Sequence, residues 1–375
     1  MIQRERLIEE FMELVRVDSE TGHEAAISGV LKAKFGGLGL TLEEDDAAQA
    51  TGHGANNLFF TLPAAEGVVA PTIFFTSHMD TVRPGNGIQP RLDADGYLRS
   101  DGTTILGSDD KAGLAAMLEA LRSLKETGAR HGEVQFVLTV GEESGLAGAR
   151  ALDRSKLRAD YGYALDSNGE VGGIATSAPG QAKIRIEVTG RSAHAGVNPE
   201  DGISAIQVAS KAIARMPLGR IDHETTANIG RFEGGGATNV VCDSALLLAE
   251  ARSADRAKLE RQIEAMREAA ESAAADFGAA AKLEATHLYP SYKHGDESAV
   301  VRSAAQAIRS IGLTPRTFHS GGGSDANVFN GLGVPTVNLA IGYEHIHTTK
   351  EQIKADDLIR TAELVKAIIE QAAGA

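Results

Sequence analysis

The sequence predicts an α/β protein in which a doubly wound mixed sheet forms a large domain, interrupted by a small ferredoxin-like α+β domain. Three observations support this fold class. Residues 134–140 (VQFVLTV) are almost continuously apolar, as in a strand covered on both faces of a parallel sheet. Strands and helices alternate up to residue 176, which favours a doubly wound layer. Residues 177–290 then follow the order strand, helix, strand, strand, helix, strand of a ferredoxin-like domain.

The elements of the large domain follow from apolar periodicity and turn residues. Amphipathic helices are expected over 7–15, 27–37, 298–311 and 356–373, and a largely buried helix over 111–125. Strands are expected over 57–62, 72–76, 134–140, 161–165 and 335–340, with a hairpin around Asp95-Gly96 and a Gly-rich turn at 320–324. We therefore expect one domain from residues 1–176 and 291–375, with the inserted domain at 177–290.

The inserted domain is indicated by a change of pattern. Residues 182–188 (AKIRIEV) alternate with period two, as in a strand with one solvated face. Further strands are expected over 226–232, 245–251 and 282–288, and helices over 202–214 and 255–277. Such alternating strands could leave a sheet edge free for pairing of two subunits.

Composition excludes several classes of protein. The 375 residues carry a formal net charge of −14 with no basic block, which argues against a nucleic-acid or anionic-membrane partner. The single cysteine, Cys242, cannot form an internal disulfide and fits a reducing compartment. The charged N-terminal segment resembles neither a signal peptide nor a membrane span. A soluble cytoplasmic protein is expected.

The central motif is SHMDTV, at the end of the apolar strand that contains Phe74 and Phe75. His78 and Asp80 lie two residues apart there. One imidazole nitrogen can bind a metal while the carboxylate accepts the proton of the other nitrogen. From this pair alone, an equally good interpretation is that His78 is a hydrogen-bonded core histidine and Asp80 forms a turn.

Four more acidic or imidazole sites follow strands or open helices of the large domain. Asp109 and Asp110 precede the buried helix, where either could simply be its N-cap. Glu142 and Glu143 follow the most apolar strand, at the edge where an open α/β sheet binds ligands, although paired glutamates are often only solvated charge. The remaining two sites are Asp166 and His347, which also follow strands.

These side chains suit two zinc ions. Zinc accepts imidazole nitrogen and carboxylate oxygen, and a catalytic site keeps a position for water. Two ions about 3.5–4 Å apart need a bridging group, which a carboxylate provides. Three carboxylates (Asp109, Glu143 and Asp166) and a hydroxide would balance four positive charges. Glu142 would then be left as general base.

With these motifs assembled, the chain resembles the di-zinc peptidase family that includes peptidase T, carboxypeptidase G and succinyl-diaminopimelate desuccinylase. SHMDTV, GTTILGSDDKAG, GEESG, ALDSNG and HTTKE occur in the family's order, and GTTILGSDDKAG is most similar to peptidase T-like members. The resemblance covers essentially the whole chain, with the inserted domain at the position of the family's lid.

The resemblance implies a role for each residue. Asp109 would bridge both metals, with His78 and Asp166 completing one ion and Glu143 and His347 the other. The family pairs this histidine with a glutamate four residues later, here Glu351, which favours His347 over His345. Asp80 would orient His78, and Glu142 would deprotonate the bridging water and protonate the leaving amine. Cobalt or manganese could replace zinc.

The inserted domain would supply substrate contacts. GRSAHAG places His194 where the family's lid histidine stabilises the oxyanion, in some members from the partner subunit; a surface loop histidine is the alternative. Asn239 and Arg252 match lid positions that contact substrate, although Arg252 could equally form a salt bridge at the rim. The GGGSD turn around Gly322 could present backbone N–H groups to substrate, or could need glycine for a tight turn.

The leading hypothesis is therefore metal-dependent hydrolysis of an amide bond in short peptides, as by a tripeptide aminopeptidase. An N-acyl-amino-acid or carbamoyl amidohydrolase with the same metal site is the alternative within the hydrolases. A non-catalytic metal- or peptide-binding protein is the alternative from another class, and the intact Glu142 argues against it. The lid domain could also pair two subunits into a homodimer.

Overall fold

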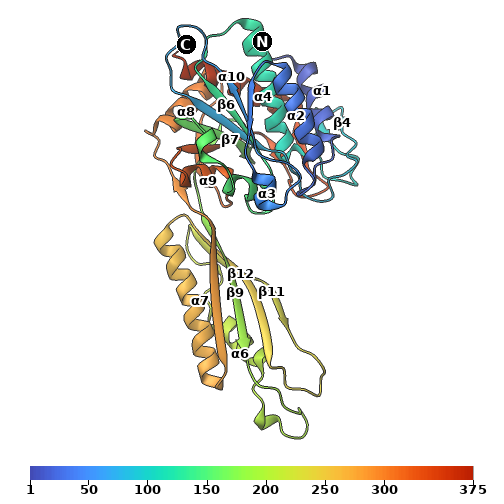
Figure 1. The fold of residues 1–375 in the computed structure, drawn as a ribbon, viewed down its shortest axis with the longest axis vertical. Coiled ribbons are helices and arrows are strands. Elements are labelled where there is room, and N and C mark those ends of the chain that lie inside the picture. The colour runs from blue at the N-terminus through green and yellow to red at the C-terminus, as the bar shows by residue number, and fades with distance from the viewer. Residues whose placement is uncertain (375) are drawn as a thin grey trace. The chain divides into compact units, whose positions relative to one another are not determined.

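A computed structural model describes residues 1–374, and its contacts divide the chain into two compact units (Figure 1). Unit 1 contains Met1–Ser177, His294–Ser320 and the chain from Ser324 onward. Unit 2 contains Ala178–Lys293 together with Gly321–Gly323. The predicted fold class is confirmed: unit 1 has a mixed central sheet between helices, and unit 2 has a separate antiparallel sheet.

The central sheet of unit 1 has parallel strands in its middle and antiparallel strands beside them. Its order is β1-β2-β6-β3-β7-β16-β8, and β15 pairs with β8. Strands β6, β3, β7 and β16 are parallel neighbours, whereas β2 and β8 pair antiparallel to β6 and β16. The bounds are β1 (Thr41–Glu44), β2 (Leu58–Leu62), β3 (Ile73–His78), β6 (Val134–Thr139), β7 (Tyr161–Ser167), β8 (Gly173–Ala178), β15 (Arg316–His319) and β16 (Thr336–Ala340).

Helices cover both faces of this sheet. Because successive strand residues point to opposite faces, Phe75 packs in the large core cluster while Phe74 packs in a smaller one. In the smaller cluster the rings of Phe74 and Phe329 lie 4.7 Å apart. The helices are α1 (Arg4–Val15), α2 (Ala25–Gly37), α3 (Ala47–Thr51), α4 (Ser108–Thr127), α5 (Ala147–Arg150), α8 (Ala299–Ser310), α9 (Asp325–Gly331) and α10 (Ala355–Ala372), with a 3₁₀ turn at Arg154–Lys156. Among residues 1–374, no helix combines the length and apolar character needed to cross a membrane.

A small antiparallel sheet joins two distant parts of unit 1. Its order is β17-β18-β5-β4. The predicted hairpin around Asp95-Gly96 is present as β4 (Arg91–Leu92) and β5 (Tyr97–Arg99). The sequence did not predict β17 (Tyr343–Glu344) or β18 (Gln352–Lys354), which are too short for a periodic signal. Pairing of β18 with β5 brings the chain after β16 beside the segment that leads to α4.

Unit 2 has the predicted ferredoxin-like arrangement. Its sheet has the order β10-β11-β12-β9-β13, with antiparallel neighbours, and α6 and α7 pack together against it (Figure 1). In β9 the residues alternate between buried and exposed, with Ile184 and Ile186 in the core. The bounds are β9 (Gly180–Thr189), α6 (Ala205–Arg215), β10 (Gly219–Arg220), β11 (Thr225–Gly234), β12 (Ser244–Ser253), α7 (Arg256–Phe277), β13 (Ala280–Tyr289) and β14 (Tyr292–Lys293), with a 3₁₀ turn at Pro199–Asp201.

Candidate metal centre

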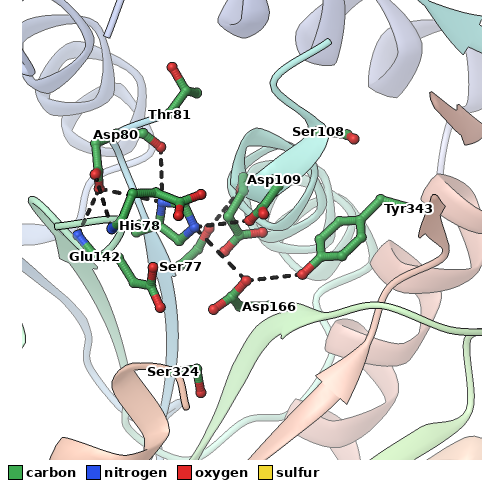
Figure 2. Close-up of polar contacts among 12 residues, drawn as sticks. Ser77, His78, Asp80, Thr81, Ser108, Asp109, Glu142, Asp166, Ser324 and Tyr343 are labelled. Atoms are coloured by element: carbon green, nitrogen blue, oxygen red, sulfur yellow. Dashed lines mark hydrogen bonds and ion pairs between the residues drawn. The ribbon is translucent and has the colours of Figure 1, made fainter. Parts of the chain in front are cut away.

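The ends of the four parallel strands bring the predicted ligands of unit 1 together. His78 is the last residue of β3, Asp166 lies near the end of β7, and Glu143 and His347 follow β6 and β16. His78, Asp109 and Asp166 each offer a ligand atom within 4.8 Å of the others, and Asp109, Glu143 and His347 form a second such group. Figure 2 shows the side chains of His78, Asp109 and Asp166 pointing toward one another. Asp109 is common to both groups.

The two carboxylate oxygens of Asp109 face different histidines. Its Oδ1 lies 3.0 Å from Nε2 of His78, and its Oδ2 lies 3.2 Å from Nε2 of His347. The outer carboxylates complete the arrangement: Asp166 Oδ1 is 3.9 Å from Nε2 of His78, and Glu143 Oε1 is 2.9 Å from Nε2 of His347. This is the geometry expected of a carboxylate shared between two cation sites.

Glu142 also lies close to this centre. It forms a third group with His78 and Glu143, whose ligand atoms are likewise within 4.8 Å of one another. The geometry therefore allows Glu142 to be either a ligand of a bound ion or a free carboxylate beside it.

The alternative in which Asp109 or Asp110 caps the buried helix is wrong. Both aspartates have non-helical backbone angles and mark a kink within α4, so the regular helix continues only after them, and neither carboxylate makes a capping hydrogen bond to it. The carboxylate of Asp109 turns to the histidines instead. The two oxygens of Asp110 are buried without a hydrogen-bond partner.

Asp80 connects His78 to the turn after β6. The Nδ1 atom of His78 lies 2.9 Å from the backbone oxygen of Asp80 and 3.4 Å from its Oδ1. The Asp80 carboxylate also accepts hydrogen bonds from the backbone amides of Glu142 and Glu143 and from the hydroxyl of Thr21. These contacts leave Nε2 of His78 facing the other candidate ligands and fix the ring orientation.

The electrostatics of the centre favour a cation. Burial and repulsion by Asp109 hold the pKa of Asp166 well above its usual range, and burial and repulsion by Asp166 do the same for Glu142. Burial lowers the pKa of His78, but hydrogen bonds to Asp109 and Asp80 outweigh this and raise it overall. Hydrogen bonds to Asp109 and Glu143 raise the pKa of His347 to about 10. Without a metal, these carboxyl groups resist ionisation and these imidazoles retain their protons. Metal ions bound here would replace the protons of both.

Several residues of the centre were missed by sequence reasoning. The hydroxyl of Tyr343 donates to Asp166 Oδ1 at 3.0 Å, a contact drawn as a dashed line in Figure 2. Asn338 accepts from the backbone amide of Asp166 and donates to its carbonyl. Asp325 is buried, with one oxygen bonded to the Thr139 hydroxyl and the other without a partner. The one usable signal was Asn338, a polar residue inside the otherwise apolar run of β16.

His347 is the histidine that reaches the other candidate ligands. His345 belongs to none of the candidate metal-binding groups found among residues 1–374. Both residues have left-handed backbone angles, which places them in a tight loop after β17.

The four remaining predicted site residues lie in unit 2, where each has local contacts. His194 is exposed, and its Nδ1 accepts from the amide of Gly196. The backbone of Asn239 bonds to the residue after His194. Arg252 forms an ion pair with Glu250 at 2.8 Å, the rim salt bridge named as its alternative. Gly322 precedes Gly323, where an added Cβ would lie 2.3 Å from the ring of Tyr289, so close packing explains the glycine at 323.

Comparisons with known proteins identify a family and near relatives. The sequence model of the family described as Peptidase family M20/M25/M40 matches residues 74–371. An uncharacterised protein, YqjE of Bacillus subtilis, is 58% identical over all of both chains. The crystal structure of aminopeptidase PepT from Bacillus cereus is 59% identical, covers 99% of each chain and has a TM-score of 0.94. That of a tripeptidase from Staphylococcus aureus is 48% identical over the whole of both chains, with a TM-score of 0.97.

Proposed function

Because the chain belongs to peptidase family M20/M25/M40, we propose that it is a di-zinc exopeptidase that removes the amino-terminal residue of short peptides, tripeptides above all. The observation that carries this proposal is the position of Asp109, whose two oxygens face the two histidines of separate candidate metal groups. Further support comes from the two solved relatives named as an aminopeptidase and a tripeptidase, which match this chain over nearly its whole length.

The residues present fit two metal ions. His78 and Asp166 would hold one ion, Glu143 and His347 the other, and Asp109 both. The set is mixed imidazole and carboxylate, which zinc accepts and which cobalt and manganese also tolerate. Ion binding would offset the burial and mutual repulsion that disfavour the charged forms of Asp166 and Glu142.

When bound, zinc would supply Lewis-acid polarisation of the scissile carbonyl and an acidified water as nucleophile. Glu142 would accept one proton from the attacking water and return it to the nitrogen of the leaving amine as the C–N bond breaks. The hydrogen bond from its backbone amide to Asp80 Oδ1, at 3.0 Å, would hold Glu142 in place during both transfers. Asp80 would also keep Nε2 of His78 directed at the ion.

The second unit would act as a lid that contributes substrate contacts. His194 would stabilise the oxyanion, from its own chain or from a partner's lid in a homodimer. Asn239 and the backbone around Gly322 would contact substrate oxygens. Arg252 would bind the terminal carboxylate of the peptide. That carboxylate would then replace the ion pair that Arg252 makes with Glu250.

The test compares substrates and measures metals on the same protein. A tripeptide with a free amino terminus, its N-acetylated form, an N-acyl amino acid and an N-carbamoyl amino acid are offered to protein whose metal content is known from elemental analysis. We expect two metal ions per chain and cleavage of the free tripeptide only. Cleavage of the N-acyl or N-carbamoyl compounds alone would replace the proposal with the amidohydrolase alternative. Tight metal binding without any amide cleavage would favour the non-catalytic alternative.

A pair of variants on one strand supplies the control. Asp166→Asn removes a proposed ligand at one end of β7. Asp160→Asn alters the carboxylate just before the other end, which accepts a hydrogen bond from the backbone amide of Thr72. The first variant should lose metal and activity, and the second should keep both. Equal behaviour of the two would contradict the assignment of Asp166.

A further inference from the structure

Glu351 binds the segment that carries Asp109 through four hydrogen bonds. Its Oε2 accepts from the backbone amides of Leu106 and Gly107, both at 2.9 Å. Its Oε1 accepts from the Ser108 hydroxyl at 2.6 Å and from the backbone amide of Asp109 at 3.0 Å. The partners lie more than 240 residues away in sequence, and the side chain is only 2% exposed. A buried carboxylate with four donors is fully satisfied and fixes the geometry of the segment it binds.

This arrangement requires a carboxylate. All four partners donate, so both oxygens have to accept. A glutamine would place its NH₂ group against at least one backbone N–H in either orientation of the amide. The site is therefore matched to Glu351 in its acceptor-only form.

Glu351 also belongs to the turn that carries His347. Its backbone amide donates to the carbonyl of Thr348 at 3.1 Å, which closes the turn directly after the histidine. His347 needs such an anchor because its side chain is 49% exposed and its backbone is left-handed (φ 62°). Strand β18 begins at the next residue and fixes the far end of the turn through its pairing with β5.

We propose that Glu351 is a positioning residue that sets the spacing between Asp109 and His347 and so preorganises the metal centre. This inference rests on the proposed function for the role of the two residues as ligands. The side chain of Glu351 holds the backbone of Asp109, while its own backbone closes the turn of His347. The 3.2 Å between Asp109 Oδ2 and His347 Nε2 is therefore set through one residue that touches neither ion site directly.

The experiment measures metal affinity and local order separately. Zinc affinity is measured by chelator competition for wild type, Glu351→Ala and Glu351→Gln. Loss of a residue that orients ligands typically lowers metal affinity about 10- to 100-fold, and we expect this range for Glu351→Ala. Glu351→Gln keeps some acceptors and should fall between. Amide hydrogen exchange of residues 104–112 in metal-free protein should be about tenfold faster in Glu351→Ala, as expected for the loss of a hydrogen bond.

Glu119→Gln is the matched control. Like Glu351, Glu119 is a buried carboxylate. It lies on α4 and accepts hydrogen bonds from Gln3 and Arg6, away from the candidate ligands. It should lower overall stability while leaving zinc affinity unchanged. If Glu119→Gln lowered affinity as much as the Glu351 variants, or if those variants kept wild-type affinity and exchange, the inference would be overturned. A wild-type protein without zinc affinity would refute the metal centre itself, and exchange in the metal-free protein would still decide whether Glu351 holds the segment that carries Asp109.

Discussion

The substitution Glu142→Gln tests the division of roles between Glu142 and the proposed ligands. The change is isosteric, and it leaves intact the hydrogen bond from the backbone amide of residue 142 to Asp80 Oδ1. It removes the group that would accept and return the proton. General acid–base catalysis typically contributes 10²–10⁴ in rate, or about 2.7 to 5.4 kcal/mol of activation free energy. We expect kcat for a free tripeptide to fall by this factor.

The metal content distinguishes the two roles that the geometry allows for Glu142. If Glu142 is a free base, the glutamine variant keeps two ions per chain by elemental analysis and keeps wild-type zinc affinity. Glu143→Gln is the matched comparison, one residue further along, and should lose both metal and activity. Loss of metal from Glu142→Gln would make Glu142 a ligand, as in its group with His78 and Glu143. Full activity with full metal content would refute the proposed mechanism.

Three further outcomes follow from the structure. Dialysis against a strong chelator should abolish peptide cleavage and lower the melting temperature, and added zinc should restore both. The melting temperature should respond because an ion that binds only the folded state stabilises that state. Activity that survives complete metal removal would contradict the metal centre. Tyr343→Phe removes the hydroxyl that donates to Asp166 Oδ1 but keeps the ring. Zinc affinity measured by competition should therefore fall about tenfold, with little change in stability. Unchanged affinity would show that Asp166 is held in place without the Tyr343 hydroxyl. Gly141→Ala places a Cβ 2.2 Å from Nε2 of His53, which bonds the Ser144 hydroxyl, and does so at φ +60°. Urea unfolding should show a loss of about 1–2 kcal/mol from the left-handed backbone alone, and His53→Ala should relieve only the part that exceeds it.

The apolar strands of unit 1 could be predicted because each is a run that no helix pattern explains. Strands β3 and β6 are buried along their entire length; the bounds expected for β6 are right to within one residue, and those expected for β3 end two residues too early. Strands β17 and β18 were not, because two or three residues give no periodicity and their pairing partners lie in β5 and in each other. Their formation depends on tertiary contacts that a local pattern does not contain.

The candidate ligands could be predicted from their position after strands, but their neighbours could not. Asp109 precedes the regular part of α4, and local rules favour a capping role; in the structure its carboxylate faces His78 and His347 instead. The acceptor that makes this conformation favourable is the carboxylate of Glu351, which is 242 residues away in sequence and accepts from the backbone amide of Asp109. Tyr343 was missed for the same reason, since nothing near it in sequence indicates that its hydroxyl reaches Asp166.

The order of the strands explains where the centre needs extra support. Four neighbouring strands, β6-β3-β7-β16, span about 14 Å at the usual spacing of ~4.8 Å, which is too wide for ligands placed only at strand ends. The two inner strands carry their proposed ligands, His78 and Asp166, on the strand itself. The proposed ligands after the outer strands, Glu143 and His347, have to return over the sheet on loops.

Each of these two loops has a buried carboxylate as its anchor. The amide of Glu143 donates to Asp80, and the turn of His347 ends at Glu351. Substitutions at Asp80 and Glu351 should therefore weaken binding of the ion that Glu143 and His347 are proposed to hold. Asp80 and Glu351 thus support the two loops, after β6 and β16, whose proposed ligands could not reach Asp109 from the strand ends alone.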